Sequence, residues 1–316
     1  MRSRARWLYR LHSLIAVAGV VTALAALAVA LSATSLSLPP AGTLLAACRS
    51  WLVPFTHPAR LLVLTLEVLS LAVIYRVAQS GWRTHRASRL FVRRLRPAGE
   101  LPGAPRVLLV NNPEPQAFCA GLLRPRVYLS TGALERLDDA ELRAVVAHEA
   151  EHALRRDPLR LFAAHVLSDA LFFLPVMRRL HRRYASLAEL AADEAAISSS
   201  GNAQPLASAL LTFGELQATG VVGASTERID HLLGERPRWE LPTSLLLGAV
   251  ISLAALVAVL ITLAHATEGS QLSAATLLMQ SCNPAILLIA GLLSLRALRL
   301  ARPTTRRSGG PTANRT

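Results

Sequence analysis

The sequence contains no lysine, so all 34 of its basic residues are arginine. Acidic residues number only 20, which leaves a formal net charge of +14. A basic protein can bind nucleic acid, but these arginines crowd beside apolar segments, as charges do when they fix the orientation of a membrane protein. The charge therefore favours a lipid bilayer as the neighbour of this chain, and direct nucleic-acid binding is not expected.

Cysteine is also scarce. Cys48, Cys119 and Cys282 are widely separated, and no pair has CxxC spacing. This pattern argues against a disulfide framework and against a zinc site built from thiolates. A reducing compartment fits the part of the chain that lies outside the membrane.

Apolar residues are abundant: they make up 52% of the chain, and the mean hydropathy is +0.39. Both values are high for a soluble globular protein. Residues 12–32, 61–78, 244–264 and 275–295 are predicted to span the membrane, since about 20 apolar residues cross the hydrocarbon core. The second segment is the weakest because it is short and contains Glu67.

The first span has an alternative interpretation as a cleaved signal peptide. Four arginines precede it, and small residues follow it from Ser32 to Ser35. Its apolar run is longer than the core of a usual signal peptide, which favours a permanent span.

Arginine is distributed unequally among the connecting segments. Four arginines precede the first span, seven lie at 76–96 and six at 296–315, whereas the first outside loop contains two and the second contains none. Arginine-rich segments stay in the cytoplasm. We therefore predict a multi-pass protein of the cell membrane with both termini and the middle of the chain in the cytoplasm.

These boundaries divide the chain into four parts. Residues 1–79 form an N-terminal transmembrane hairpin, and 80–240 form a cytoplasmic domain large enough for its own core. Residues 241–298 form a second hairpin, and 299–316 form a basic tail with the composition of a disordered segment. The predicted fold class is an α-helical membrane protein with a mostly α, mixed α+β, cytoplasmic domain.

Local patterns predict the elements of the cytoplasmic domain. Residues 106–110 and 126–130 are short branched apolar runs that read as strands on either side of AFCAG at 117–121. Asp138 and Glu141 have the spacing of a capping box, so a helix is expected from about 139 to 156.

Residues 161–178 are also apolar, but His165 and Asp169 interrupt them. A crossing there would place Glu189 and His148 on opposite sides of the membrane. If these two residues share a site, the segment stays on the cytoplasmic side, packed in the domain or lying on the bilayer surface.

The pentapeptide HEAEH at 148–152 lies within the helix predicted at 139–156. His148 and His152 are one turn apart on the same face and can offer two imidazole nitrogens to one zinc ion. Glu149 stands beside the first ligand, where a general base for the attacking water belongs. The alternative is an exposed polar helix face with no metal.

A catalytic zinc ion normally has three protein ligands and one open position, so a third donor is needed. Glu189 and Asp193 lie four residues apart in LAELAADEAA at 187–196, on a second predicted helix. Glu189 is expected to bind the zinc ion, one per chain, while Asp193 accepts a hydrogen bond from a ligand imidazole. The alternative is two solvated acids on an amphipathic helix.

The stretch GLLRPRVYLSTGALERLDDAELRAVVAHEAEHALRRDP, followed by ELAADEAA, resembles the BlaR/MecR-type membrane metallopeptidases and, less closely, the HtpX and CAAX prenyl endopeptidases. The resemblance covers roughly residues 100–235. It implies a gluzincin-like zinc peptidase domain with His148, His152 and Glu189 as ligands. It also implies that 227–237, with its RIxxLL pattern, is structural. The BlaR-type aspartate is matched by Asp157, either near the ligands or stabilising the following turn.

The resemblance implies a regulatory endopeptidase that cleaves a cytoplasmic protein or peptide, such as a winged-helix repressor of the BlaI/MecI kind. Two alternatives remain: an HtpX-type protease for membrane-protein quality control, and a membrane scaffold in which zinc is structural or absent. In the enzyme, the strand around 117–120 is expected to bind an extended substrate. The stabiliser of the oxyanion stays open among His165, His181, Tyr184 and a nearby arginine.

Overall fold

The computed structural model describes residues 1–32, 34–35, 58–101, 104–216, 226–233, 243–267 and 272–273. Two compact units are present. One combines Met1–Leu27 with Val68–Ile261, and the other combines Ala28–Glu67 with Thr262–Thr316. In the second unit, β1 (Thr34–Ser35) pairs in parallel with β6 (Leu272–Ser273). The first unit holds all the residues predicted to bind metal.

Three helices cover the predicted spans within the described part of the chain: α1 (Arg2–Ser32), α3 (Pro58–Arg94) and α10 (Thr243–Thr267). Two stretches are long and apolar enough to cross a membrane, Arg2–Val29 and Thr243–Thr262. The spans predicted at 12–32 and 244–264 fall on these two helices. The segment 61–78 is helical within α3 but is not among the two candidates, and 275–295 lies outside the described residues.

The described part of the first unit contains a mixed sheet in the order β2-β3-β5-β4. β3 and β5 are parallel, whereas β2 pairs with β3 and β4 pairs with β5 in antiparallel fashion. The strands predicted at 106–110 and 126–130 are confirmed as β3 and β5. β2 was not predicted, because its sequence PAGEL contains proline and glycine, which are depleted in strands. In the structure this strand is mostly exposed. The strand bounds are β2 Pro97–Leu101, β3 Ala104–Val110, β4 Ala117–Ala120 and β5 Arg126–Ser130.

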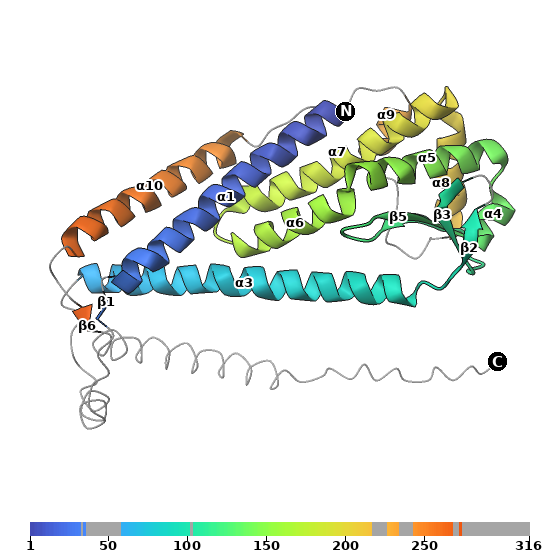
Figure 1. Ribbon diagram of the computed structural model, residues 1–316. Helices are drawn as coiled ribbons and strands as arrows, with labels where there is room; N and C mark the ends of the chain where they lie inside the picture. The colour runs from blue at the N-terminus through green and yellow to red at the C-terminus, as the bar shows by residue number, and fades with distance from the viewer. Residues whose placement is uncertain are drawn as a thin grey trace, which may run out of the picture. The chain divides into compact units, whose positions relative to one another are not determined.

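Six helices follow the sheet along the described chain: α4 (Thr131–Arg136), α5 (Asp139–Arg155), α6 (Asp157–Ala170), α7 (Pro175–Ser200), α8 (Gln204–Leu216) and α9 (Thr226–Leu232). Figure 1 shows α5 and α7 lying side by side.

The helix predicted from 139 to 156 is confirmed as α5, and so is its capping box. The Asp138 carboxylate accepts hydrogen bonds from the backbone N–H groups of Ala140 and Glu141, and the Glu141 carboxylate accepts one from the N–H of Asp138. At the other end Arg156 adopts a left-handed conformation, with φ 55°, and α6 begins at the next residue. This abrupt turn brings Asp157 back toward the last turn of α5.

Residues 161–178 belong to the core of the first unit. Ala170, Leu171 and Met177 are fully buried in a cluster formed by the first half of α1 with α6 and α7. A second cluster lies between the sheet and α5, around Leu129 and Val145. Of the two positions that the sequence left open for 161–178, the structure shows packing within the domain.

Candidate metal centre

Two imidazoles and one carboxylate converge between α5 and α7. The Nε2 atoms of His148 and His152 are 3.2 Å apart. One carboxylate oxygen of Glu189 lies 3.6 Å from Nε2 of His148, and the other lies 3.5 Å from Nε2 of His152. One possible ligand atom from each residue falls within 4.8 Å of the others, so a single small ion can contact all three.

The donor set fits zinc. Zinc is bound by imidazole nitrogen and carboxylate oxygen, and a catalytic site uses three protein ligands with one position left for water. Both histidines are buried, while Glu189 is partly exposed toward a cavity of about 650 Å³. The histidine side of the cluster is therefore buried, whereas the Glu189 side is open to the cavity, from which a substrate can reach it.

The remaining ring nitrogens face buried carboxylates. Nδ1 of His148 lies 3.0 Å from Oδ1 of Asp193, and Nδ1 of His152 lies 3.0 Å from Oδ2 of Asp157. The hydroxyl of Tyr184 donates a hydrogen bond of 3.1 Å to the other oxygen of Asp157. With a proton on each Nδ1, both Nε2 atoms present a lone pair to the metal position.

Arg228, on α9, also reaches the site. Its Nε and Nη2 donate hydrogen bonds of 2.9 and 2.6 Å to the two oxygens of Asp193, and its Nη1 lies 3.2 Å from Oε2 of Glu189. The expectation for this stretch was a purely structural role, from its RIxxLL pattern. An arginine 35 residues from its partner gives no spacing signal, so the sequence did not place it here.

The charges of the cluster shift its pKa values. Burial alone would lower the pKa of His148, but hydrogen bonds to Asp193 and Glu189 raise it to about 9. Burial would raise the pKa of Glu189, but the hydrogen bond from His148 and the charges of His152 and Arg228 lower it to about 2. The carboxylate is therefore ionised at neutral pH and available as a ligand.

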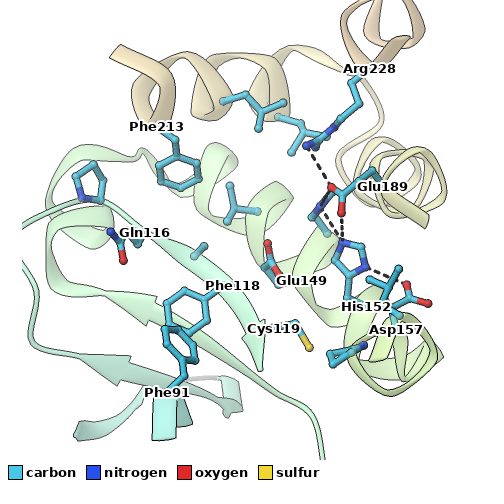
Figure 2. Close-up of a pocket in the computed structure, with 18 residues that line it drawn as sticks. Phe91, Gln116, Phe118, Cys119, Glu149, His152, Asp157, Glu189, Phe213 and Arg228 are labelled. Carbon is cyan, nitrogen blue, oxygen red and sulfur yellow. Dashed lines mark hydrogen bonds and ion pairs between the residues drawn. The ribbon is translucent and has the colours of Figure 1, made fainter. Parts of the chain in front are cut away.

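Glu149 faces the same cavity as His152 and Glu189 (Figure 2). Burial raises the pKa of its carboxyl group, while the two ligand histidines and a hydrogen bond from the backbone N–H of Cys119 lower it in part. A carboxylate with a raised pKa is a stronger base than one in water. Glu149 thus has the position and the basicity that proton transfer at the metal position requires.

The cavity is lined on one side by the edge strand β4, through Ala117, Phe118 and Cys119. The sequence left four candidates open for stabilising the oxyanion. Among the described residues that line the cavity the arginine is Arg228, whereas His165, His181 and Tyr184 do not line it. Tyr184 is completely buried beside Asp157.

Similarity to known proteins supports the same interpretation. Residues 82–228, a little under half of the chain, match the model of Peptidase family M48. A protease HtpX homolog of Acidiphilium cryptum is 38% identical over 69 residues, which cover 21% of this chain and 24% of the relative. Protease HtpX homolog 2 of Methanosarcina mazei is 36% identical over 85 residues, covering 26% and 29%. Protease HtpX of Legionella pneumophila is 35% identical over 69 residues, covering 21% and 25%.

The chain thus spans only about a quarter of the length of these relatives. Within that stretch the sequence match and the side-chain geometry agree. Residues 82–228 are therefore similar to the metallopeptidases of family M48, and the His-His-Glu group of this stretch fits one zinc ion.

Proposed function

We propose that this chain is a membrane-anchored, zinc-dependent endopeptidase of the HtpX type. The observation that carries the proposal is the convergence of His148, His152 and Glu189 on one position while Glu149 faces the same cavity. A scaffold with a structural metal has no use for a base beside an open coordination position. In this proposal His148, His152 and Glu189 are the zinc ligands and Glu149 is the general base.

Zinc in this group supplies a Lewis acid that lowers the pKa of a water molecule to roughly 7. Glu149 accepts a proton from the attacking water and later passes it to the nitrogen of the leaving amine. The raised pKa of Glu149 suits both steps, because it makes the carboxylate a better base and keeps the acid form accessible.

Asp193 and Asp157 hold the two ligand imidazoles in place through their Nδ1 atoms. Arg228 compensates the charge of Asp193 and restrains Glu189 from the other side. Such partners keep the ligand nitrogens aimed at one point, so that little reorganisation is needed when metal binds.

The substrate is proposed to bind as an extended strand along β4. β4 pairs with β5 on one side, and its other side borders the cavity, so a peptide can extend the sheet there. Apolar side chains, among them Phe118, Leu210 and Phe213, line the cavity, and only a few polar groups outside the metal cluster join them. This lining favours substrates with apolar side chains near the cleaved bond.

Membrane proteins are the substrates that we propose, in line with the quality-control alternative. The reported relatives carry the name HtpX, and the M48 model covers the same domain. Cleavage of a cytoplasmic repressor of the BlaI/MecI kind has less support, because it depends on the BlaR-type resemblance alone.

We also propose that the domain lies at the cytoplasmic face of the cell membrane. The candidate membrane helices within α1 and α10 support an anchor on both sides of the domain. The further spans at 61–78 and 275–295, the domain limits 80–240 and the cytoplasmic position of both termini are part of this proposal. The distribution of arginine carries it.

The test uses the full chain purified in detergent, the Glu149→Ala variant and a control variant, Glu135→Ala, whose glutamate is exposed on α4. Zinc per chain and cleavage of an unfolded membrane protein are measured for each. We expect about one zinc ion in all three proteins and cleavage by the wild type and Glu135→Ala only. Equal cleavage by Glu149→Ala, or wild-type protein that binds no zinc, would reject the proposal.

A further inference from the structure

A second cavity, of about 1110 Å³, lies on the opposite side of α5 from the metal centre. Ala147, Ala150, Glu151 and Leu154 of α5 line this second cavity, whereas His148, Glu149 and His152 line the first. Residues three and four apart share a helix face, so these two sets lie on different faces of α5. The second cavity is therefore separated from the metal ligands by the width of one helix.

Arginine dominates this second cavity. Arg106 of β3, Arg124 and Arg126 around the start of β5, and Arg156 at the end of α5 all line it, and all four are exposed. None of the four makes an ion pair with another residue in the described ranges. We call the cavity with these four residues the arginine groove.

Acidic residues do not neutralise the arginine groove. Glu100 and Glu151 are the acids among its described lining residues. The carboxylate of Glu151 is almost fully buried and is already paired with Arg2, through contacts of 2.9 Å to Nε and 2.9 Å to Nη2. Four unpaired guanidinium groups facing one free carboxylate leave the groove positive.

Two leucines stand out of the protein surface at the same place. Leu123 and Leu154 both line the groove, and they are 77% and 78% exposed. Each precedes an arginine of the groove closely in sequence: Leu123 is followed by Arg124, and Leu154 by Arg156 two residues later. The surface thus offers apolar contacts between positive charges.

We propose that the arginine groove binds an acidic segment of a protein partner in which apolar residues alternate with Asp or Glu. Carboxylates pair with guanidinium groups through two parallel hydrogen bonds, and apolar side chains of the segment can cover Leu123 and Leu154. The groove lies beside β3 and β5 and has a volume of about 1110 Å³.

The lining favours a peptide segment over an anionic lipid headgroup as the occupant. Four guanidinium groups and two exposed leucines line the groove. A segment with alternating acidic and apolar side chains can contact both kinds of group along its length, whereas a single headgroup presents one phosphate.

The groove contains no residue of the metal centre, so its occupancy does not depend on hydrolysis. Binding is therefore measured with the Glu149→Ala chain, which cannot cleave the probe. The probe is a fluorescein-labelled peptide of twelve residues with alternating Glu and Leu. Its binding is measured by fluorescence anisotropy in detergent at low salt. A peptide with Gln in place of every Glu serves as the uncharged probe.

Two double variants in the Glu149→Ala chain separate the groove from general attraction by a basic protein. Arg106→Glu with Arg124→Glu reverses two charges in the groove. Arg136→Glu with Arg143→Glu reverses two exposed charges of the same domain outside it. We expect the groove variant to bind the acidic peptide at least about tenfold more weakly and the control variant to stay within about twofold. Binding should weaken as salt is raised, and the Gln peptide should bind far more weakly.

Equal loss of affinity in the two double variants would overturn the proposal, because the peptide would then follow net charge alone. The absence of saturable binding to the parent chain would overturn it as well. Displacement of the bound peptide by vesicles of phosphatidylglycerol, but not of phosphatidylcholine, would assign the groove to lipid instead. Circular dichroism of both double variants checks that the fold is retained.

Discussion

Each ligand histidine is oriented by a carboxylate that is almost completely buried. Asp157 is 1% exposed and Asp193 is 0% exposed. Water therefore does not reach either carboxylate, and loss of its hydrogen-bond partner would leave a buried charge unpaired, which is unfavourable. Asp157 is also fixed by the Tyr184 hydroxyl, which leaves its second oxygen for Nδ1 of His152. This arrangement predetermines the direction of the imidazole that binds metal.

We predict that Asp157→Asn weakens zinc affinity by about 10- to 100-fold, because the imidazole of His152 loses its anionic partner. The measurement is competition with a chelator of known affinity, read as zinc retained per chain. Asp139→Asn, an exposed residue of α5, is the matched control and should leave affinity unchanged. If both variants retain zinc equally, Asp157 only stabilises the turn after α5.

Cys119 lines the metal cavity, but its chemistry is suppressed. Burial, followed by the charges of Glu149 and Asp157, raises the pKa of this thiol to about 12. The thiolate is the reactive form, so its fraction is about a thousandfold lower than for a thiol with a pKa of 9 at the same pH. Cys119 is therefore a packing residue of β4 rather than a nucleophile.

Alkylation tests this directly. At pH 8 we expect Cys119 in the folded chain to react with iodoacetamide roughly a thousandfold more slowly than in the guanidinium-unfolded chain. The rate should keep rising with pH up to about 12 as long as the fold persists. Mass spectrometry of the peptide that contains Cys119 gives both rates. A folded rate near the unfolded one would show that the thiol is ionised near neutrality.

The sequence predicted the residues of the metal centre on α5 and α7 and missed the one on α9. HExxH spacing places His148, Glu149 and His152 by helix geometry alone. Glu189 and Asp193 were reached through their spacing on a second helix, and the structure brings both to the cluster. Arg228 was assigned no part in the site, because its contacts depend on where α9 packs against α7, which no periodicity encodes.

At the scale of elements, α9 is fixed to α7 by ion pairs of two neighbouring residues, Glu227 and Arg228. Arg228 binds Asp193, and the preceding residue, Glu227, accepts hydrogen bonds from Arg183, at 2.6 and 2.7 Å, and from Ser186, at 2.7 Å. A seven-residue helix has little stability of its own, so these contacts decide its position. The position of α9 in turn sets the guanidinium beside Glu189.

Glu227→Gln should therefore loosen α9 at neutral pH. Burial would raise the pKa of Glu227, but the hydrogen bonds from Arg183 and Ser186 and the charge of Arg183 lower it below its usual value. A carboxyl group with a lowered pKa stabilises the fold above its unfolded pKa of about 4.3, and this stabilisation is lost as pH falls through the folded value.

We expect Glu227→Gln to lower stability by about 1 kcal/mol at pH 7, since the pair is partly exposed, and by much less below pH 4. Thermal unfolding of zinc-free protein at both pH values gives the difference without interference from metal release. Hydrogen exchange of the α9 amides should increase in the variant at pH 7. A stability loss that is equal at pH 7 and below pH 4 would exclude an ionic role for Glu227.

The elements themselves were largely predictable. α5 followed from apolar periodicity and the capping box, and β3 and β5 followed from short branched runs between turn residues. β2 escaped because pairing with β3, rather than its own composition, makes PAGEL a strand. For residues 161–178 the sequence left two positions open, the bilayer surface and the domain core. An apolar helix has the same sequence pattern in both, and only its neighbours in the fold distinguish them.

At the scale of the whole first unit, which combines Met1–Leu27 with Val68–Ile261, the first half of α1 is part of the core. Leu8 is fully buried against α6 and α7, the ring of Tyr9 lies 5.2 Å from that of Tyr184, and Nε2 of His12 is 3.1 Å from the hydroxyl of Ser168. From the sequence, residues 12–32 are recognisable only as an apolar span. Apolar side chains suit contact with lipid and contact with protein equally, so the sequence does not show which of them pack in the core. α1 thus packs Tyr9 against Tyr184, the tyrosine that donates a hydrogen bond to Asp157.

This packing predicts that a substitution in α1 weakens the distant metal centre. Leu8→Ala removes a completely buried side chain and should lower stability by about 3 kcal/mol, as for other core leucines. Leu14→Ala, on the same helix but with 68% of its side chain exposed, is the matched control and should have little effect in detergent. Thermal unfolding and zinc retention against a chelator are measured for both. Loss of stability and zinc in Leu8→Ala alone means that α1 supports the peptidase fold, whereas equal behaviour of the two variants means that α1 is only an anchor.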